Sequence, residues 1–409
     1  MSQHLKAPAG HGTGHGHSHG PAPAASQHTR RIVTAVLVPA AVATIVAMIV
    51  LWPGSVAGPA DQVGAQGGVR ALGTVTTVDE RACPPPTDAT AQPPGWVQRC
   101  GSATVRVTDG PGEGQETTVD LPQGSGVAPL HVHDDVVLAF FPDATADGRA
   151  YAVTEHQRSA PMLWMLALAV AAILLFGRWR GVSSLAGLAV SFAILLLFVI
   201  PAILQGSSPL LVAVVGSSAI MFAALYLTHG VNVHTSVAVA GTLLSLVLTG
   251  VLGVVFTSLM RLTGVSGDDS SYLSATQGDI DLRGLLLAGI VIGALGVLDD
   301  VTVTQAMTVA EMSSGGRPSR LQLYRSAIRV GRAHVASAVN TIVLAYAGAS
   351  LPLLLVIAAG TQPVSELLTS EFLAQEILRS AVGTIGLVAS VPITTGLAVL
   401  VADLRPSRR

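Results

Sequence analysis

The chain has 409 residues, of which 50% are hydrophobic, 11% charged and 4% aromatic, and its formal net charge is -2. A soluble domain carries about 25% charged residues, so this composition argues against an ordinary soluble enzyme, a disordered chain or a nucleic-acid-binding protein. The apolar residues are mainly Ala, Val, Leu and Ile, as in helices that pack in lipid. Charge is unevenly distributed, since residues 53–160 hold 13 acidic residues and 6 Arg. This asymmetry predicts at least two regions in different environments.

Residues 1–31 form a segment of low complexity, rich in His and Gly. It has no apolar period on which to fold, so we expect a disordered cytoplasmic tail. Flexibly spaced imidazoles bind Zn²⁺, Ni²⁺ or Cu²⁺ weakly, and no Cys is present here to complete a tetrahedral site. We therefore predict no metal site and keep a weak metal-collecting role as the alternative, carried by His11, His15, His17 and His19.

The first long apolar run covers residues 32–52 and follows Arg30 and Arg31. Its 21 residues can cross a hydrocarbon core of about 30 Å, which predicts a first transmembrane helix. A cleavable signal peptide is the competing interpretation. We favour an uncleaved anchor because the hydrophobic region of a signal peptide usually has only about 7 to 15 residues.

Residues 53–160 change character and predict a small all-β domain. Stretches of alternating apolar and polar residues are separated by Gly, Pro and Asp clusters, which is typical of short strands joined by turns. Five such strands suit a compact barrel, which could be of the OB type. Two cysteines spaced 17 apart, Cys83 and Cys100, are expected to form a disulfide outside the cytoplasm. The cluster His131 to Asp135 is interpreted as a turn before a strand.

The remaining apolar runs predict a seven-helix membrane domain over residues 161–403, followed by a cytoplasmic tail at 404–409. With the first helix, the fold class is an all-α membrane bundle of about eight transmembrane helices, with the β domain inserted after the first. Arginine is enriched in cytoplasmic loops, and its distribution here predicts a cell-membrane protein with both termini inside and residues 53–160 outside. The predicted spans are about 32–52, 162–176, 182–204, 209–228, 236–259, 285–309, 335–359 and 381–402.

Two adjacent carboxylates, Asp299 and Asp300, lie near the middle of the apolar stretch 285–311. An ionised Asp at the bilayer centre costs at least about 2.5 kcal/mol, so such residues usually face inward and are functional. Neighbouring carboxylates resist ionising together, which suits the handling of protons or cations. Thr304 shares a helix face with Asp300. The alternative is that the membrane core ends near Val297 and the pair begins a cytoplasmic extension.

Further polar residues in the last two spans are weaker candidates for the same site. Asn340 and Thr341 lie in the span after the Asp pair, where such side chains either line a site or join helices. Pro392 lies inside the last span, where it frees backbone carbonyls or simply bends the helix. The secondary candidates are Glu311, His334, Tyr346 and Pro392.

Three blocks of the second half resemble the YibE/F-like family of multi-pass membrane proteins. They read DLRGLLLAGIVIGALGVLDDVTVTQAMTVAEM, VGRAHVASAVNTIVLAYAGASLPLLL and EFLAQEILRSAVGTIGLVASVPITTGLAV, and GVNVHTSVAVAGTLLSLVLTG precedes them. The resemblance covers about residues 150–403 and implies a multi-pass fold, but no particular substrate or catalytic residue. Here Asp299 and Asp300 stand where the family has one Asp, and His334 stands where an acidic residue is commoner. Residues that fall in the blocks also include Gly331, Arg332, Asn340, Thr341, Tyr346, Glu371, Glu376, Arg379, Gly386 and Pro392.

The leading hypothesis is a secondary transporter or permease for an unknown small solute or ion, with the intramembrane Asp pair in its pathway. The alternative is a membrane-anchored receptor or envelope assembly scaffold that acts through the β domain. No phosphate-binding loop or catalytic motif is present in the sequence, so we expect neither an enzyme nor a cofactor. The expected partners are the lipid bilayer and the solute, with homo-oligomers possible and no nucleic acid.

Overall fold

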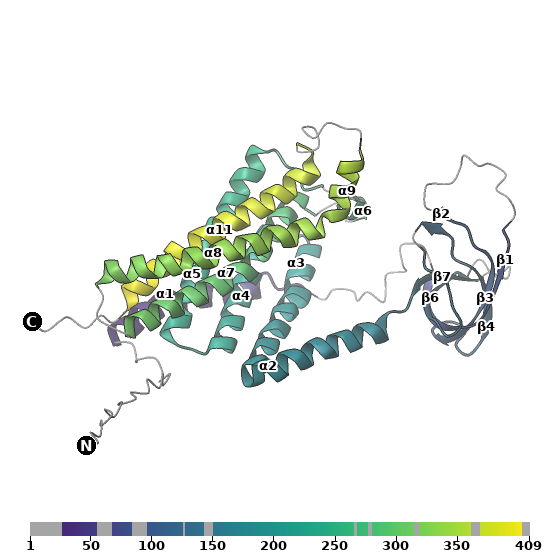
Figure 1. The fold of residues 1–409 in the computed structure, drawn as a ribbon, viewed down its shortest axis with the longest axis horizontal. Coiled ribbons are helices and arrows are strands. Elements are labelled where there is room, and N and C mark those ends of the chain that lie inside the picture. The colour runs from purple at the N-terminus through teal and green to yellow at the C-terminus, as the bar shows by residue number, and fades with distance from the viewer. Residues whose placement is uncertain are drawn as a thin grey trace, which may run out of the picture. The chain divides into compact units, whose positions relative to one another are not determined.

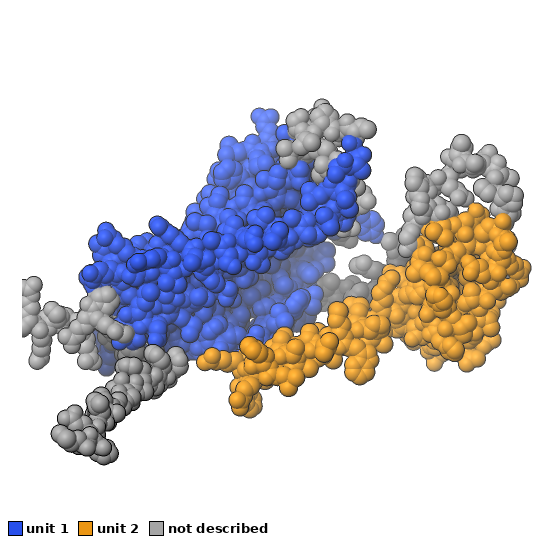
Figure 2. Space-filling model, viewed as in Figure 1, with its two compact units in different colours: residues 1–53, 183–409 blue, residues 54–182 orange. Residues whose placement is uncertain are grey.

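The computed structural model describes residues 27–54, 68–83, 96–125, 127–142, 150–265, 268–276, 280–314, 319–360 and 369–402. The chain forms two compact units, one of residues 1–53 and 183–409 and one of residues 54–182, coloured separately in Figure 2. The histidines predicted for a metal-collecting tail and the tail at 404–409 lie outside the described residues.

The smaller unit contains a five-stranded antiparallel sheet, in line with the predicted all-β domain, with strands in the order β4-β3-β1-β6-β7 (Figure 1). The strands form because inward Ala, Val and Leu alternate with polar residues facing out. The core includes Val75, Val105 and Leu138, each at most 1% exposed. The strands are β1 (Val69–Arg81), β3 (Cys100–Asp109), β4 (Glu116–Asp120), β6 (Asp135–Phe140) and β7 (Tyr151–His156), with a separate pair β2 (Trp96–Val97) and β5 (Gly124–Ser125).

Two local contacts hold this sheet together at its ends. Cys83 and Cys100, the cysteines expected to pair, are joined by a disulfide that ties the end of β1 to the start of β3. The Tyr151 hydroxyl on β7 donates a 2.7 Å hydrogen bond to the Pro111 carbonyl, which follows β3. The sheet therefore curls until its edge strand β7 reaches the turn before the opposite edge strand, β4.

The larger unit is a bundle of helices. Its centre is formed by α5 (Val233–Leu259), α7 (Leu282–Ser314) and α11 (Glu371–Val401), which pack against one another. Around them pack α4 (Pro209–His229) on α7, α8 (Arg320–Ala349) on α11 and α7, and α1 (Gln27–Val50) on α4 and α5 (Figure 1). Short helices α3 (Ile200–Leu204), α6 (Asp268–Thr276) and α9 (Leu351–Ala359) complete the described part.

Six helical segments in the described residues are long and apolar enough to cross a membrane. The longest, Ser159–Leu204, joins α2 (Ser159–Ile194), a π-helical turn η3 (Leu195–Val199) and α3, and contains two of the predicted spans. Within α2 the backbone turns sharply at Arg178, where φ is 50°. A Cβ on Gly181 would lie 2.5 Å from the Ile173 carbonyl oxygen, so the chain folds back on itself there.

The predicted span 335–359 is divided between α8 and α9, which are separated at Ser350. Pro352 lies in the first turn of α9, where backbone N–H groups have no partner within the helix, so the proline costs no hydrogen bond there and favours the start of a new helix. The first half of α8 is too rich in Arg to count among the six apolar segments. The predicted number of eight membrane spans therefore remains a prediction.

Candidate functional site

Helix α7 positions the Asp pair, as the uninterrupted apolar stretch predicted. Successive residues of an α-helix are rotated by about 100°, so the two carboxylates diverge. Asp299 is half-buried, and its Oδ1 is a buried atom with no hydrogen-bond partner among the described residues. Asp300 instead has a side chain that is 77% exposed. The sequence did not indicate which of the two carboxylates is the better candidate for the site. The greater burial of Asp299 makes it the better candidate.

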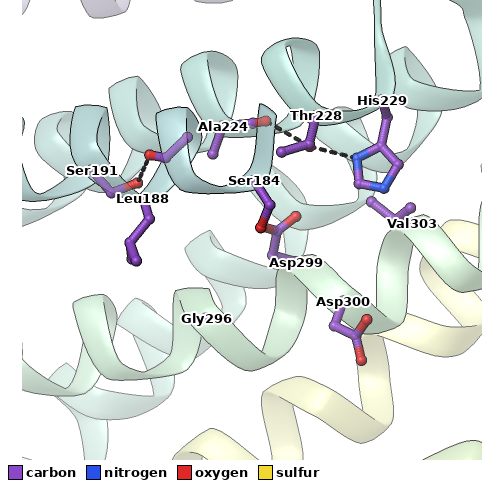
Figure 3. Close-up of a pocket in the computed structure, with 11 residues that line it drawn as sticks. Ser184, Leu188, Ser191, Ala224, Thr228, His229, Gly296, Asp299, Asp300 and Val303 are labelled. Atoms are coloured by element: carbon purple, nitrogen blue, oxygen red, sulfur yellow. Dashed lines mark hydrogen bonds between the residues drawn. The ribbon is translucent and has the colours of Figure 1, made fainter. Parts of the chain in front are cut away.

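Asp299 faces a pocket with a volume of about 320 Å³ between α2, α4 and α7. In Figure 3 its carboxylate is directed toward the side of the pocket where Ser184 lies, while that of Asp300 points away. Among the described residues, no Lys or Arg lines the pocket, so no basic side chain there neutralises its negative charge. The lining residues are Ser184, Gly187, Leu188, Ser191, Ala224, Thr228, His229, Gly296, Asp299, Asp300 and Val303.

Two hydroxyl groups of the lining direct their hydrogens away from the pocket. Ser191 donates to the Gly187 carbonyl at 2.9 Å, and Thr228 donates to the Ala224 carbonyl at 2.7 Å. The His229 Nδ1 lies 2.7 Å from Thr228 Oγ1 (Figure 3). Which of these two atoms donates depends on the tautomer of the imidazole. Because the Ser191 hydroxyl hydrogen is used in its bond to Gly187, the Ser191 oxygen can only accept a hydrogen bond or bind a cation in the pocket.

Asp300 connects the pocket to helix α8. Its Oδ2 lies 3.7 Å from Nε2 of His334, a side chain that is 38% exposed. The Nε2 atom itself is buried and makes no hydrogen bond within the described residues. The distance exceeds that of a hydrogen bond, so the two groups form a loose ion pair when the histidine is protonated.

A buried polar cluster fixes α7 in the bundle next to Asp299. Thr302 and Thr242 on α5 are fully buried, and their hydroxyl oxygens lie 2.6 Å apart, while Thr302 also reaches the Asp299 carbonyl at 3.1 Å. One turn further, Gln305 donates to the Ala327 carbonyl at 2.9 Å and to Thr395 Oγ1 at 2.7 Å. Interhelical hydrogen bonds of this kind hold helices together where there is no water.

Glycines let the helices around α7 approach closely enough for these bonds to form. A Cβ on Gly331 of α8 would lie 2.7 Å from Gln305 Oε1 and 2.5 Å from Val391 Cγ1. Between α5 and α11, glycines at positions 241 and 386 each face a threonine of the other helix, whose hydroxyl oxygen lies 2.2 Å from where a Cβ would stand. Small residues at helix crossings are typical of membrane bundles.

Most of the other predicted site residues do not line the pocket. Asn340 and Thr341 are exposed on α8, and Thr341 bonds only back to the Ser337 carbonyl at 3.1 Å. Thr304 is half-buried and Glu311 is exposed, on the outward face of α7 that they share with Asp300. Pro392 is exposed inside α11, which continues as a helix through it, and Tyr346 is half-buried, with its hydroxyl 3.4 Å from where a Cβ on Gly293 would stand.

The sequence interpretation missed the pocket residues outside α7. Ser184, Gly187 and Ser191 follow one another at helical spacing within an apolar segment, which was a readable signal for a polar face. Thr228 and His229 end helix α4 and carried no signal, because polar residues at a helix end are ordinary. Across the described ranges, no group of three or more His, Cys, Asp or Glu is arranged to hold a metal ion.

The model of the YibE/F-like protein family matches residues 165–404, which is more than half of the chain and includes every residue of the pocket. No curated protein and no solved structure matches the chain. The family match confirms the resemblance seen in the three sequence blocks. The chain therefore belongs to the YibE/F-like family.

Proposed function

We propose that this protein is a membrane permease or secondary transporter and that Asp299 is the residue of its pathway that binds the transported or coupling ion. The observation that carries the proposal is the buried, unpartnered Oδ1 of Asp299 facing a pocket of about 320 Å³. A carboxylate is expensive in an apolar bundle, and it is retained where it pairs with an ion, a proton or a substrate. Intramembrane sites between packed helices are typical of transporters.

The proposal includes a location in the cell membrane with both termini in the cytoplasm. The supporting observation is the arginine distribution, with Arg320, Arg325, Arg329 and Arg332 exposed along the start of α8. In this orientation the pocket lies toward the cytoplasmic side of the bundle, because its lining residues Thr228 and His229 end α4 on that side. The β domain then lies outside.

The test is to reconstitute the full chain in proteoliposomes and record electrical currents when a panel of small solutes and cations is applied. We expect the native protein to give solute-dependent currents, which the Asp299→Asn variant loses. Glu311→Gln serves as the matched control, because Glu311 is an exposed carboxylate on the same helix that does not line the pocket. A native protein without current for any member of the panel would contradict the proposal.

The second candidate function is a receptor or assembly scaffold that acts through the β domain. It is supported by the domain's separate core and by a strand order and curl that suit an OB-like barrel, a fold that uses one face to bind oligomeric ligands. Replacing residues 60–150 with a short linker separates the two functions. The transporter proposal expects flux to persist in this variant, whereas loss of the cellular phenotype with unchanged flux would favour the scaffold.

A further inference from the structure

Two buried polar atoms that lack hydrogen bonds within the described residues belong to side chains next to Asp300. One is Oδ1 of Asp299, its neighbour on α7, and the other is Nε2 of His334 on α8. Asp300 Oδ2 lies 3.7 Å from this nitrogen. Buried polar atoms without partners are costly, so an arrangement that keeps two of them beside an exposed carboxylate calls for a transient occupant.

The groups around this site can change their charge by exchanging protons. The titratable side chains are Asp299 and Asp300 on α7, His229 on α4 and His334 on α8, while α2 contributes only serine hydroxyls. The part of α11 that packs here is apolar, through Leu387 and Val391. Carboxylates and imidazoles both bind and release protons, which favours the proton as the occupant.

We propose that the coupling ion of this protein is the proton, and that His334 exchanges it with the Asp pair through Asp300. This inference rests on the proposed transport function. In the exchange, the carboxyl proton leaves Oδ2 of Asp300 and binds Nε2 of a neutral His334, leaving a carboxylate and an imidazolium with no change in the number of protons. Closing the gap of 3.7 Å needs only a small rotation of the exposed Asp300 side chain.

The second step of the exchange links Asp300 to Asp299, the carboxylate that faces the pocket. Two adjacent carboxylates hold one proton more readily than none, because their charges repel. The two side chains diverge, so Asp300 acts on Asp299 through its charge: loss of the proton from Asp300 favours a proton on Asp299, whose Oδ1 has no hydrogen-bond partner in the described structure. His334 is thus assigned as the group that connects the pocket to the α8 side of the bundle.

The test uses full-length protein in proteoliposomes that contain a fluorescent pH indicator, with a potassium diffusion potential as the driving force. We expect the native protein to change the internal pH, and His334→Gln to slow this change by about tenfold or more, as for loss of a general acid–base group. Because glutamine exchanges no proton, the variant also loses the dependence of the rate on pH that the native protein shows. His156→Gln, in the β domain, is the control and leaves both unchanged.

A second variant distinguishes proton exchange from a structural role. If His334 and Asp300 act as one unit, Asp300→Asn flattens the same pH profile and the double variant is no slower than the slower single variant. Native currents without any change of internal pH would overturn the proton as coupling ion while leaving the transport function intact. A His334→Gln profile identical to the native one would overturn the role of His334, and no current of any kind would refute the transport function itself.

Discussion

The contact between Gly386 on α11 and Thr249 on α5 gives a prediction whose magnitude follows from the structure. A Cβ at position 386 would stand 2.2 Å from Thr249 Oγ1, against 3.4 Å or more for an ordinary contact. The hydroxyl cannot easily rotate away, because it donates to the Ser245 carbonyl at 2.8 Å. Gly386→Ala therefore forces the two helices apart by about 1 Å, and overpacking of this kind costs about 1 to 3 kcal/mol.

A neighbouring glycine on the same helix provides the control for this experiment. Gly383 has nothing within 4 Å of the position of a Cβ, so Gly383→Ala adds a methyl group to open space. Alanine is favoured over glycine in a helix by about 1 kcal/mol, and both variants share this gain. The difference in the free energy of unfolding between the two variants thus isolates the clash, at about 1 to 3 kcal/mol.

The assay is unfolding of the purified protein in mixed micelles, followed by circular dichroism as the fraction of denaturing detergent rises. Thr249→Ala removes the clashing oxygen and leaves Thr249 Cβ 3.4 Å from the new methyl group. The double variant Gly386→Ala, Thr249→Ala should therefore recover most of the loss. If Gly386→Ala and Gly383→Ala were equally stable, the close packing of α5 on α11 described above would be wrong.

Three further predictions concern the pocket, the β domain and the buried polar cluster. Gly296→Leu adds a side chain to open space at the pocket wall and should reduce the transport rate by about tenfold, without changing the size-exclusion elution profile of the protein. Gly396→Leu on α11 also adds a side chain to open space, but away from the pocket, and should leave the transport rate unchanged. Removing the disulfide by changing Cys83 and Cys100 to Ala, a bridge across 17 residues, should destabilise the β domain by about 3 kcal/mol, measured by protease susceptibility of the full chain. Gln305→Leu should lower the stability of the bundle by about 1 kcal/mol in the micelle assay, because two interhelical hydrogen bonds are lost. Unchanged transport in Gly296→Leu would contradict the role of the pocket. Unchanged stability after removal of the disulfide or in Gln305→Leu would contradict the stabilising role given to that bridge or to those hydrogen bonds.

The elements that were predicted well have strong local patterns. The strands of the β domain alternate over several residues, and α7 is one long apolar segment, so local sequence determined both. The arrangement of α8 was harder to predict, because Asn340 and Thr341 share a helix with His334 but are exposed. Which face of a helix turns inward depends on its neighbours, and spacing within the helix does not contain that information.

The pocket could be predicted only in part for a related reason. Asp299 and Asp300 attract attention because charge is rare in an apolar segment. Ser184 and Thr228 are ordinary in sequence, and they acquire a role only because α2 and α4 pack beside α7 and bring them to the same cavity. Contacts between distant segments are set by tertiary packing, so a single sequence predicted the carboxylates and missed their surroundings.

The most direct test of the account compares the solute-dependent current of native protein with that of Asp299→Asn in matched proteoliposomes. Asn has nearly the same size as Asp but carries no charge and exchanges no proton, so the pocket keeps its shape. The account predicts that the current falls to the level of empty liposomes, while Glu311→Gln keeps the native current. An Asp299→Asn variant that folds normally and transports at the native rate would contradict the central claim that this buried carboxylate binds the ion.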